Sequence, residues 1–222
     1  MEVFELLLAH FGPRHWWPAK SPFEVAVGAI LVQSVSWENT ARAVRNLEDA
    51  GCLDPHRLDA LSEEELARLI VPSLYFRQKA KKLKAFVRVL VEEHGGDLAG
   101  MLSGATGDVR RKLLSIWGIG PETADSILLY AGGHPVFVVD AYTRRIFARL
   151  GVWDESVTYD EMQRYFHRHL PADVPLFNEY HALLVALGSR YCAKTQPRCG
   201  GCPLAAHCLY ARSGRGEGGE PG

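Results

Sequence analysis

The stretch 113–140 constrains the fold more than any other part of the chain, because two short helical patterns flank a tight break. The break reads Trp-Gly-Ile-Gly-Pro, and Gly118 and Gly120 have no Cβ, so their backbone N–H groups can approach a partner closely. Pro121 suits the first turn of the second helix, whose free N–H groups and positive dipole end attract an anion. The pattern predicts a helix–hairpin–helix that grips one DNA phosphate without reading sequence. For the two glycines alone, an ordinary helical hairpin is the alternative.

An acidic residue follows this stretch at the start of a further helical pattern. The apolar run 135–139 ends at Asp140, and Ala-Tyr-Thr-Arg-Arg-Ile-Phe comes next. An aspartate at this place caps a helix by accepting backbone N–H bonds from the next turn. We expect those bonds, with Arg144 and Arg145 nearby, to keep the carboxylate ionised. Asp140 is then either a helix cap alone or a cap that also presents a charge to a ligand.

Composition excludes some classes of protein without identifying one. The 222 residues, 47% of them hydrophobic, suffice for one large domain or two small ones. No apolar run approaches the ~18 residues that span a membrane, and the N-terminus is acidic where a signal peptide is basic, so we expect a cytosolic, nucleoid-associated protein. The net charge is −1, yet residues 77–88 carry six cations and no acid. Such a run is either a phosphate-binding patch or a solvated helix face.

Four of the five cysteines lie within 17 residues, spaced as C-x6-C-x2-C-x5-C. Without an export signal, this grouping indicates a metal site rather than disulfides. Four thiolates can hold zinc or a [4Fe–4S] cluster, and the spacing alone does not decide between them. The remaining cysteine, Cys52, is expected to be a small buried hydrophobe.

The hairpin, its distance from Asp140 and the cysteine spacing together resemble the endonuclease III-like members of the helix-hairpin-helix superfamily of DNA glycosylases. The resemblance covers nearly all of residues 1–210. It implies an all-α, two-domain fold: a six-helix bundle at 20–133 with the hairpin, a second domain from 1–19 and 134–210, and a disordered tail at 211–222. It also implies a [4Fe–4S] cluster held by four ligands, Cys192, Cys199, Cys202 and Cys208. DNA is expected to lie bent across the cleft between the domains, with one nucleotide flipped out.

The resemblance further implies roles in holding DNA. Gln33 matches a glutamine that fills the gap left by the flipped nucleotide, although it can also simply cap loop carbonyls. Tyr75 matches an intercalating side chain in a second wedge loop. Trp16 and Trp17, followed by proline, resemble the site where 3-methyladenine glycosylases stack the damaged base; packing at a domain junction is the alternative. The full set expected to contact DNA is Gly118, Ile119, Gly120, Thr123, Gln33, Tyr75, Lys79, Lys194 and Arg198.

One position departs from the strand-cutting members of the family. They carry a lysine two residues after the second hairpin glycine, and its amine forms a Schiff base with the sugar. This chain has Glu122 there, and a carboxylate cannot form an imine. Hydrolysis without a covalent intermediate needs only a carboxylate near the positive sugar of the transition state. We therefore expect Asp140 to be the catalytic carboxylate, with Glu122 facing the same pocket as a second catalytic acid that bonds a partner or acts on Asp140 by like-charge repulsion. For Glu122, favourable placement near a helix N-terminus is the alternative.

The expected function is that of a monomeric, monofunctional base-excision-repair glycosylase acting on damaged bases in double-stranded DNA, with alkylated purines such as 3-methyladenine first. A cationic base stacks well on tryptophan and leaves easily. Two alternatives remain open. One is an endonuclease III-type glycosylase and lyase for oxidised pyrimidines or mismatched uracil; the other is a non-catalytic binder of damaged or abasic DNA.

Overall fold

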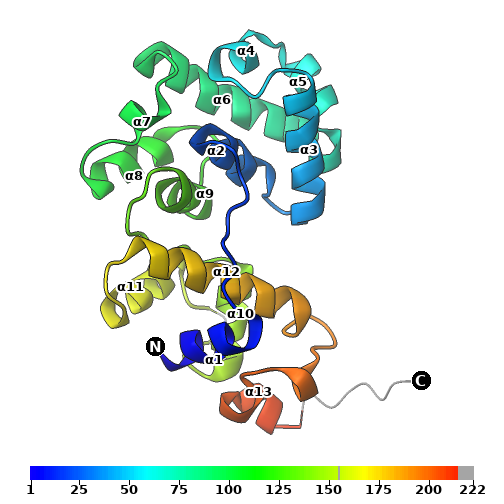
Figure 1. The fold of residues 1–222 in the computed structure, drawn as a ribbon, viewed down its shortest axis with the longest axis vertical. Coiled ribbons are helices and arrows are strands. Elements are labelled where there is room, and N and C mark those ends of the chain that lie inside the picture. The colour runs from blue at the N-terminus through cyan, green and yellow to red at the C-terminus, as the bar shows by residue number, and fades with distance from the viewer. Residues whose placement is uncertain (155, 215–222) are drawn as a thin grey trace. The chain divides into compact units, whose positions relative to one another are not determined.

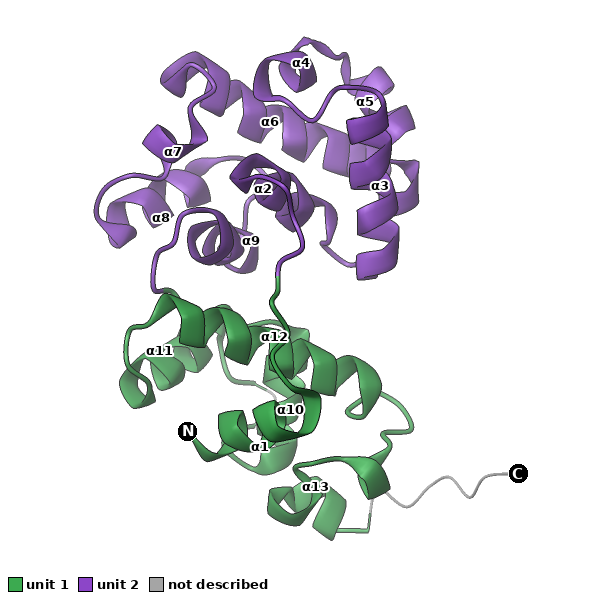
Figure 2. Cartoon of the chain, viewed as in Figure 1, with its two compact units in different colours: residues 1–16, 136–222 green, residues 17–135 purple. Residues whose placement is uncertain are grey.

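The computed structural model describes residues 1–154 and 156–214, and all regular secondary structure in these ranges is helical (Figure 1). The prediction of an all-α fold is confirmed. The chain forms two compact units, drawn in different colours in Figure 2. Unit 1 consists of Met1–Trp16 with Val136–Gly222, and unit 2 is Trp17–Pro135. The chain therefore passes between the units at the paired tryptophans and directly after Pro135, within the apolar run that leads to Asp140.

Unit 2 is built around two helices that lie deepest in it. In α2 (Pro22–Leu31) nearly every side chain is buried, which fits its almost continuously apolar sequence. In α6 (Phe76–His94) one face is buried, and α4 and α5 pack against it. The other elements of the unit are α3 (Trp37–Asp49), α4 (Pro55–Ala60), α5 (Glu63–Leu69), η1 (Val71–Ser73), α7 (Leu98–Met101), α8 (Thr106–Ser115), α9 (Pro121–Ser126) and η2 (Ile127–Ala131).

Side-chain caps explain where several of these helices begin. Ser21 accepts the N–H of Glu24 at the start of α2, and Ser36 caps α3 in the same way. At α5, Ser62 and Glu65 form a capping box, in which each side chain bonds the other residue's backbone N–H. Local sequence therefore marks these three helix starts, since Ser21, Ser36 and Ser62 each stand directly before the helix that they cap.

Unit 1 contains α1 (Glu2–Phe11), α10 (Ala141–Leu150), α11 (Tyr159–His169), α12 (Val174–Arg190) and α13 (Leu209–Arg212), with the short turns η3 (Cys199–Gly201) and η4 (Ala205–His207). Its core is aromatic. Phe137, from the apolar run before α10, stacks on Phe166 of α11 with the ring centroids 3.8 Å apart. Phe177 and Tyr180 of α12 contact the ring of Phe137 edge-on.

The expected disordered tail, 211–222, needs a correction at its start. Ala211 and Arg212 are helical, because α13 is held in place: the ring of Tyr210 lies under the guanidinium of Arg149 at 4.6 Å, and Leu209 packs closely on Gly151. Residues 215–222 of that expected tail lie outside the described residues.

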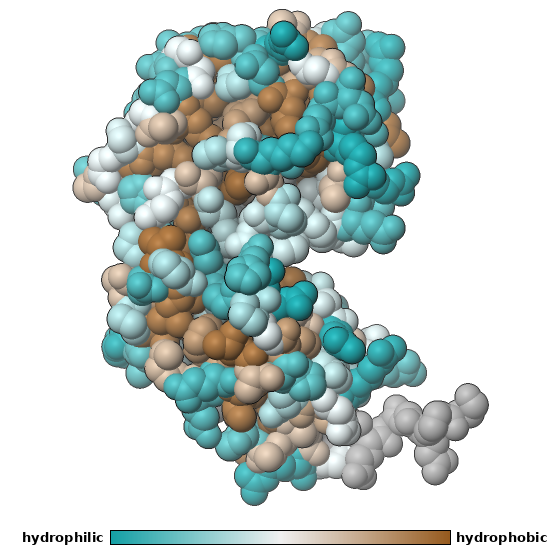
Figure 3. Space-filling view, in the orientation of Figure 1, coloured by the Kyte–Doolittle hydropathy of each residue, from teal (hydrophilic) through white to brown (hydrophobic). Residues whose placement is uncertain are grey.

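The surface visible in Figure 3 mixes hydrophilic side chains with scattered apolar ones in both units. Among the described residues, no helix has both the length and the apolar character needed to cross a membrane.

Candidate functional site

The predicted helix–hairpin–helix is present, formed by α8, a five-residue connection and α9. Gly118 has φ +86°, and a Cβ there would lie 2.4 Å from Cγ of Lys82, so both conformation and space require glycine. Gly120 has an ordinary extended backbone and open space where a Cβ would lie. Trp117, directly before the first glycine, is 57% exposed.

One hairpin prediction is wrong in detail. Ile119 is 5% exposed, and its N–H donates to the carbonyl of Ile116 at 3.1 Å. In this conformation it offers DNA neither its side chain nor its N–H, and it anchors the hairpin to the core of unit 2. Thr123 is also buried, and its hydroxyl accepts a hydrogen bond of 2.8 Å from Nε2 of Gln33.

Lys79 also departs from expectation. Its side chain is 2% exposed, and Nζ donates to the carbonyls of Leu31, at the end of α2, and Ser73, in η1. Burial, with Lys82 close by, lowers the pKa of Lys79 to about 8. Direct phosphate contact by this lysine is therefore contradicted by its burial. Its amine instead joins the segments that lead to Gln33 and Tyr75.

Tyr75 is displayed by an unusual turn. Leu74 and Tyr75 both have positive φ, 54° and 42°, although neither is glycine. Two such residues in succession cost conformational energy and are typical of functional loops. Tyr75 is 70% exposed, and Leu74 is 51% exposed. The strained turn thus projects two apolar side chains into solvent.

Three half-exposed aromatic rings cluster in unit 2. Trp17 meets Trp37 at right angles, with centroids 5.1 Å apart, and lies 5.3 Å from the ring of Tyr130. Gly28 of α2 makes room for the first of these rings, since a Cβ there would lie 3.1 Å from it. The sequence analysis identified Trp17 but missed Trp37 and Tyr130. Trp16, also half-buried, belongs to unit 1.

Asp140 caps α10, as predicted. Oδ1 accepts both the N–H of Thr143, at 2.7 Å, and its hydroxyl, at 2.8 Å. Oδ2 lies 3.6 Å from Nε2 of His181 in α12, and the two side chains are 12% and 8% exposed. The carboxylate therefore has one oxygen committed to the helix and the other facing an imidazole.

This environment keeps the carboxylate charged. Burial by itself would raise the pKa of Asp140, but the nearby imidazole of His181 and the two bonds from Thr143 outweigh it and lower the pKa. The expected contribution of Arg144 and Arg145 is wrong: the first donates to the carbonyl of Val157, and the second to that of Cys192. His181 was missed because no local pattern marks it.

Two acids on α9 have different surroundings. Glu122 is exposed in the first turn of this helix. Asp125 is fully buried and forms a two-bond ion pair with Arg110, at 2.7 and 3.0 Å. The second acid thus fastens α9 to α8 and leaves the first as the carboxylate that this helix presents to solvent.

Two of the four clustered cysteines contact the same arginine. Nη1 of Arg149 donates to Sγ of Cys192 at 3.2 Å, and Sγ of Cys208 donates to the carbonyl of Arg149 at 3.3 Å. Burial raises the pKa of Cys202 to about 11, and the neighbouring thiols of Cys192, Cys208 and Cys199 add to the increase. All five cysteines are free thiols, and Cys52 is half-buried rather than buried. Within the described ranges, no three metal-binding side chains form a group that could hold a single ion.

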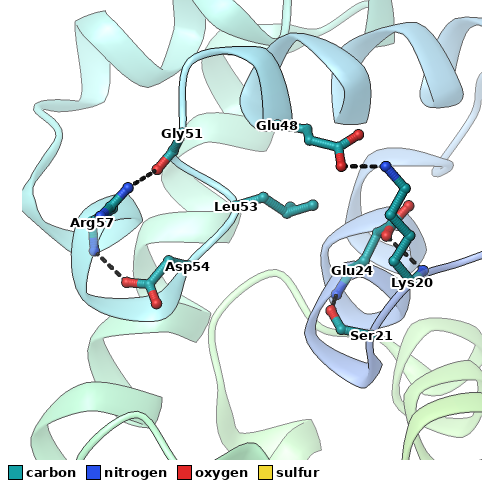
Figure 4. A pocket seen from close by; sticks show the side chains of 8 residues that line it. All are labelled: Lys20, Ser21, Glu24, Glu48, Gly51, Leu53, Asp54 and Arg57. Carbon is teal, nitrogen blue, oxygen red and sulfur yellow. Dashed lines mark hydrogen bonds and ion pairs between the residues drawn. The ribbon is translucent and has the colours of Figure 1, made fainter.

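A polar pocket of about 410 Å³ lies elsewhere in unit 2 (Figure 4). Lys20 is paired there with Glu48, and Arg57 donates to the backbone carbonyl of Gly51. The residues that line this pocket include none of the candidate site residues.

Comparisons with known proteins agree on one family. A sequence profile described as HhH-GPD superfamily base excision DNA repair protein matches residues 27–172. A putative DNA repair glycosylase of Methanocaldococcus jannaschii is 42% identical over 209 residues, 94% of each chain. Endonuclease III of Thermotoga maritima is 33% identical, over 88% of this chain and 87% of the relative.

Solved structures show the same fold. The 3-methyladenine DNA glycosylase of Helicobacter pylori, bound to 1,N6-ethenoadenine, matches with a TM-score of 0.75 and 26% identity, over 85% of this chain and 96% of that one. An endonuclease III–DNA covalent intermediate matches with a TM-score of 0.83 and 21% identity, over 96% and 95%. The chain therefore belongs to the HhH-GPD superfamily of base excision DNA repair proteins and is a DNA glycosylase.

Proposed function

We propose that this glycosylase hydrolyses the N-glycosidic bond of alkylated purines in double-stranded DNA, with an ionised carboxylate and without a covalent amine. The observation that carries the substrate class is the aromatic cluster of Trp17, Trp37 and Tyr130. Two of its rings stand perpendicular and all three are half-exposed. Ring faces attract cations, and a purine alkylated on a ring nitrogen is a flat cation. The H. pylori neighbour, a 3-methyladenine glycosylase, supports the same class.

Asp140 supplies the negative charge. Breaking the bond between base and sugar builds positive charge on the sugar ring, and a fixed carboxylate stabilises that charge. The lowered pKa of Asp140 keeps it ionised at neutral pH. Because Oδ1 is bonded to Thr143, we assign the sugar or the attacking water to Oδ2, which has the imidazole of His181 beside it at 3.6 Å.

Glu122 supports hydrolysis over lyase chemistry. A lyase of this family needs an amine that attacks C1′ of the sugar, and the exposed first turn of α9 offers a carboxylate instead. The product is then an abasic site in an intact strand. A role for Glu122 in binding water or the sugar hydroxyls fits its exposure.

Contact with DNA is assigned to three places. Gly118 and Gly120 in the hairpin hold a phosphate, Gln33 enters the gap left by the flipped nucleotide, and the exposed Tyr75 separates the neighbouring bases. Trp16 remains a second candidate for stacking.

The spacing of the cysteines supports a [4Fe–4S] cluster as the group that this loop binds. Cys192, Cys199, Cys202 and Cys208 are free thiols and supply the four sulfur ligands that such a cluster takes. When bound, such a cluster fixes the loop and performs no step of the hydrolysis. Lys194 and Arg198, both exposed on this loop, are then held where they can meet phosphate.

A panel of duplexes tests the proposal, each with one lesion: 3-methyladenine, 1,N6-ethenoadenine, thymine glycol or mismatched uracil. We expect free base from the alkylated purines, and strand breaks only after alkali. The identity to Thermotoga endonuclease III favours one other outcome, namely release of oxidised pyrimidine with breaks before alkali. That result, or tight binding without release of any base, would overturn the proposal.

A further inference from the structure

The side-chain amide of Gln33 is held by three other segments of unit 2. Oε1 accepts a hydrogen bond from Nζ of Lys82, in the middle of α6. Nε2 donates to the hydroxyl of Thr123 at 2.8 Å and to the carbonyl of Gly118 at 3.4 Å. One amide thus joins the end of α2, the α6 helix and both sides of the hairpin turn.

The chemistry of the partners fixes the orientation of this amide. An ammonium group can only donate and a backbone carbonyl can only accept. Lys82 must therefore face Oε1, and Gly118 must face Nε2. Flipping the amide by 180° would oppose donor to donor and acceptor to acceptor, so the side chain has one favourable arrangement.

Lys82 reaches this place because the hairpin leaves room for it. Its aliphatic stem lies against Gly118, where a Cβ would approach Cγ to 2.4 Å. The side chain is half-buried, unlike Lys81, which is exposed on the next position of the helix. The close approach of hairpin backbone and lysine stem fixes where the ammonium can be.

We propose that Lys82 is a positioning residue that holds Gln33 against the hairpin, in the orientation in which its amide enters the gap left by a flipped nucleotide. The inference rests on the proposed function and deepens it. A glutamine that must fill a gap in DNA loses side-chain entropy when it does so. Fixing its rotamer beforehand reduces that loss on binding. Because the same contacts reach Gly118, gripping a phosphate and filling the gap occur on one connected framework.

A double-mutant cycle tests this inference through binding, independently of base release. The probe is a duplex with a tetrahydrofuran abasic analogue, compared with an undamaged duplex of the same sequence. We expect K82M to weaken binding to the abasic duplex about tenfold more than binding to the undamaged one, the factor that losing one hydrogen bond to a charged group implies. In a Q33A background the same substitution should change the preference for abasic DNA less than twofold.

Matched variants separate positioning from simple attraction to phosphate. K81M removes the same charge at the exposed neighbouring position. It should weaken binding to the two duplexes equally, with either glutamine or alanine at position 33. K82R keeps a donor and should retain most of the preference. If K82M does not fold, T123V removes the hydrogen bond on the other side of Gln33. This variant should also weaken binding to the abasic duplex more than binding to the undamaged duplex.

Two results would overturn the inference: equal weakening of both duplexes by K82M, or an undiminished effect of K82M in the Q33A background. Either would mean that Lys82 acts on DNA without Gln33. The proposed function fails separately, when wild-type protein releases no alkylated purine, and the binding cycle remains interpretable in that case.

Discussion

Asp140 in unit 1 and Gln33 in unit 2 are both polar side chains in fixed orientations, but they are held in different ways. Asp140 takes two of its three contacts from Thr143, three residues along its own helix. Gln33 takes all of its recorded contacts from residues 49 or more positions away. Local chemistry therefore determines most of the first environment, whereas the packing of several helices determines the second.

The largest expected effect is on the rate of base release when Asp140, the locally held residue, is changed. D140N keeps the size and an acceptor for Thr143 but removes the charge. We expect single-turnover release of alkylated purine to fall by about 10²–10³-fold, the usual loss when a preorganised charge or donor is removed from a transition state. Affinity for an abasic duplex should change little. If D140N releases base at a wild-type rate, the carboxylate of Asp140 is not the group that stabilises the sugar.

The next effect concerns the aromatic cluster, which like Gln33 depends on distant partners. W37A should slow release of cationic 3-methyladenine about tenfold, as the loss of one stacking and cation–π partner implies. Release of uncharged 1,N6-ethenoadenine should be slowed less. W37F, which keeps a ring, serves as the matched control. Equal effects on the two bases would mean that the rings recognise shape and not charge.

The hairpin glycines give a smaller effect with an internal control. G118A meets both a positive φ and the stem of Lys82, so it should lower the free energy of unfolding by about 1–3 kcal/mol. G120A has ordinary dihedral angles and open space, so the change should be under about 0.5 kcal/mol. Urea unfolding measures both. Equal stability of the two variants would contradict the close contact at Gly118.

The smallest effect is the pH dependence of stability. The folded pKa of Asp140 lies below its ordinary value of 3.8, so its contribution is present above that pH and is lost as pH falls through the folded pKa. H181N removes the charge that helps to lower the pKa, so acid unfolding of this variant should begin at a higher pH than in the wild type. Coincident acid transitions would show that His181 does not act on Asp140.

The contrast between local and distant contacts also explains which features could be predicted from the sequence. The hairpin, the buried α2 and the Asp140 cap follow from patterns within a few residues, and each is present. Lys79 was misplaced because charge was counted without regard to the face of the helix. It lies four and seven residues before Leu83 and Phe86, which is the spacing of the buried face.

The parts of the site that were missed depend on tertiary packing. His181 reaches Asp140 across 41 positions of sequence, and no local pattern marks a partner at that distance. No local pattern marks Trp37 or Tyr130 either, and only the ring that both of them contact has a local signal. Gly28 interrupts an otherwise apolar helix, and a glycine there indicates close approach of a neighbour. In the structure that neighbour is Trp17.

The central claim is that an acid and not an amine assists removal of the base. Borohydride trapping during the reaction with 3-methyladenine duplex tests it most directly, because borohydride reduces an imine between protein and sugar to a stable covalent adduct. The account predicts free base, an intact strand and no protein–DNA adduct. A stable adduct formed at the rate of base release would contradict it.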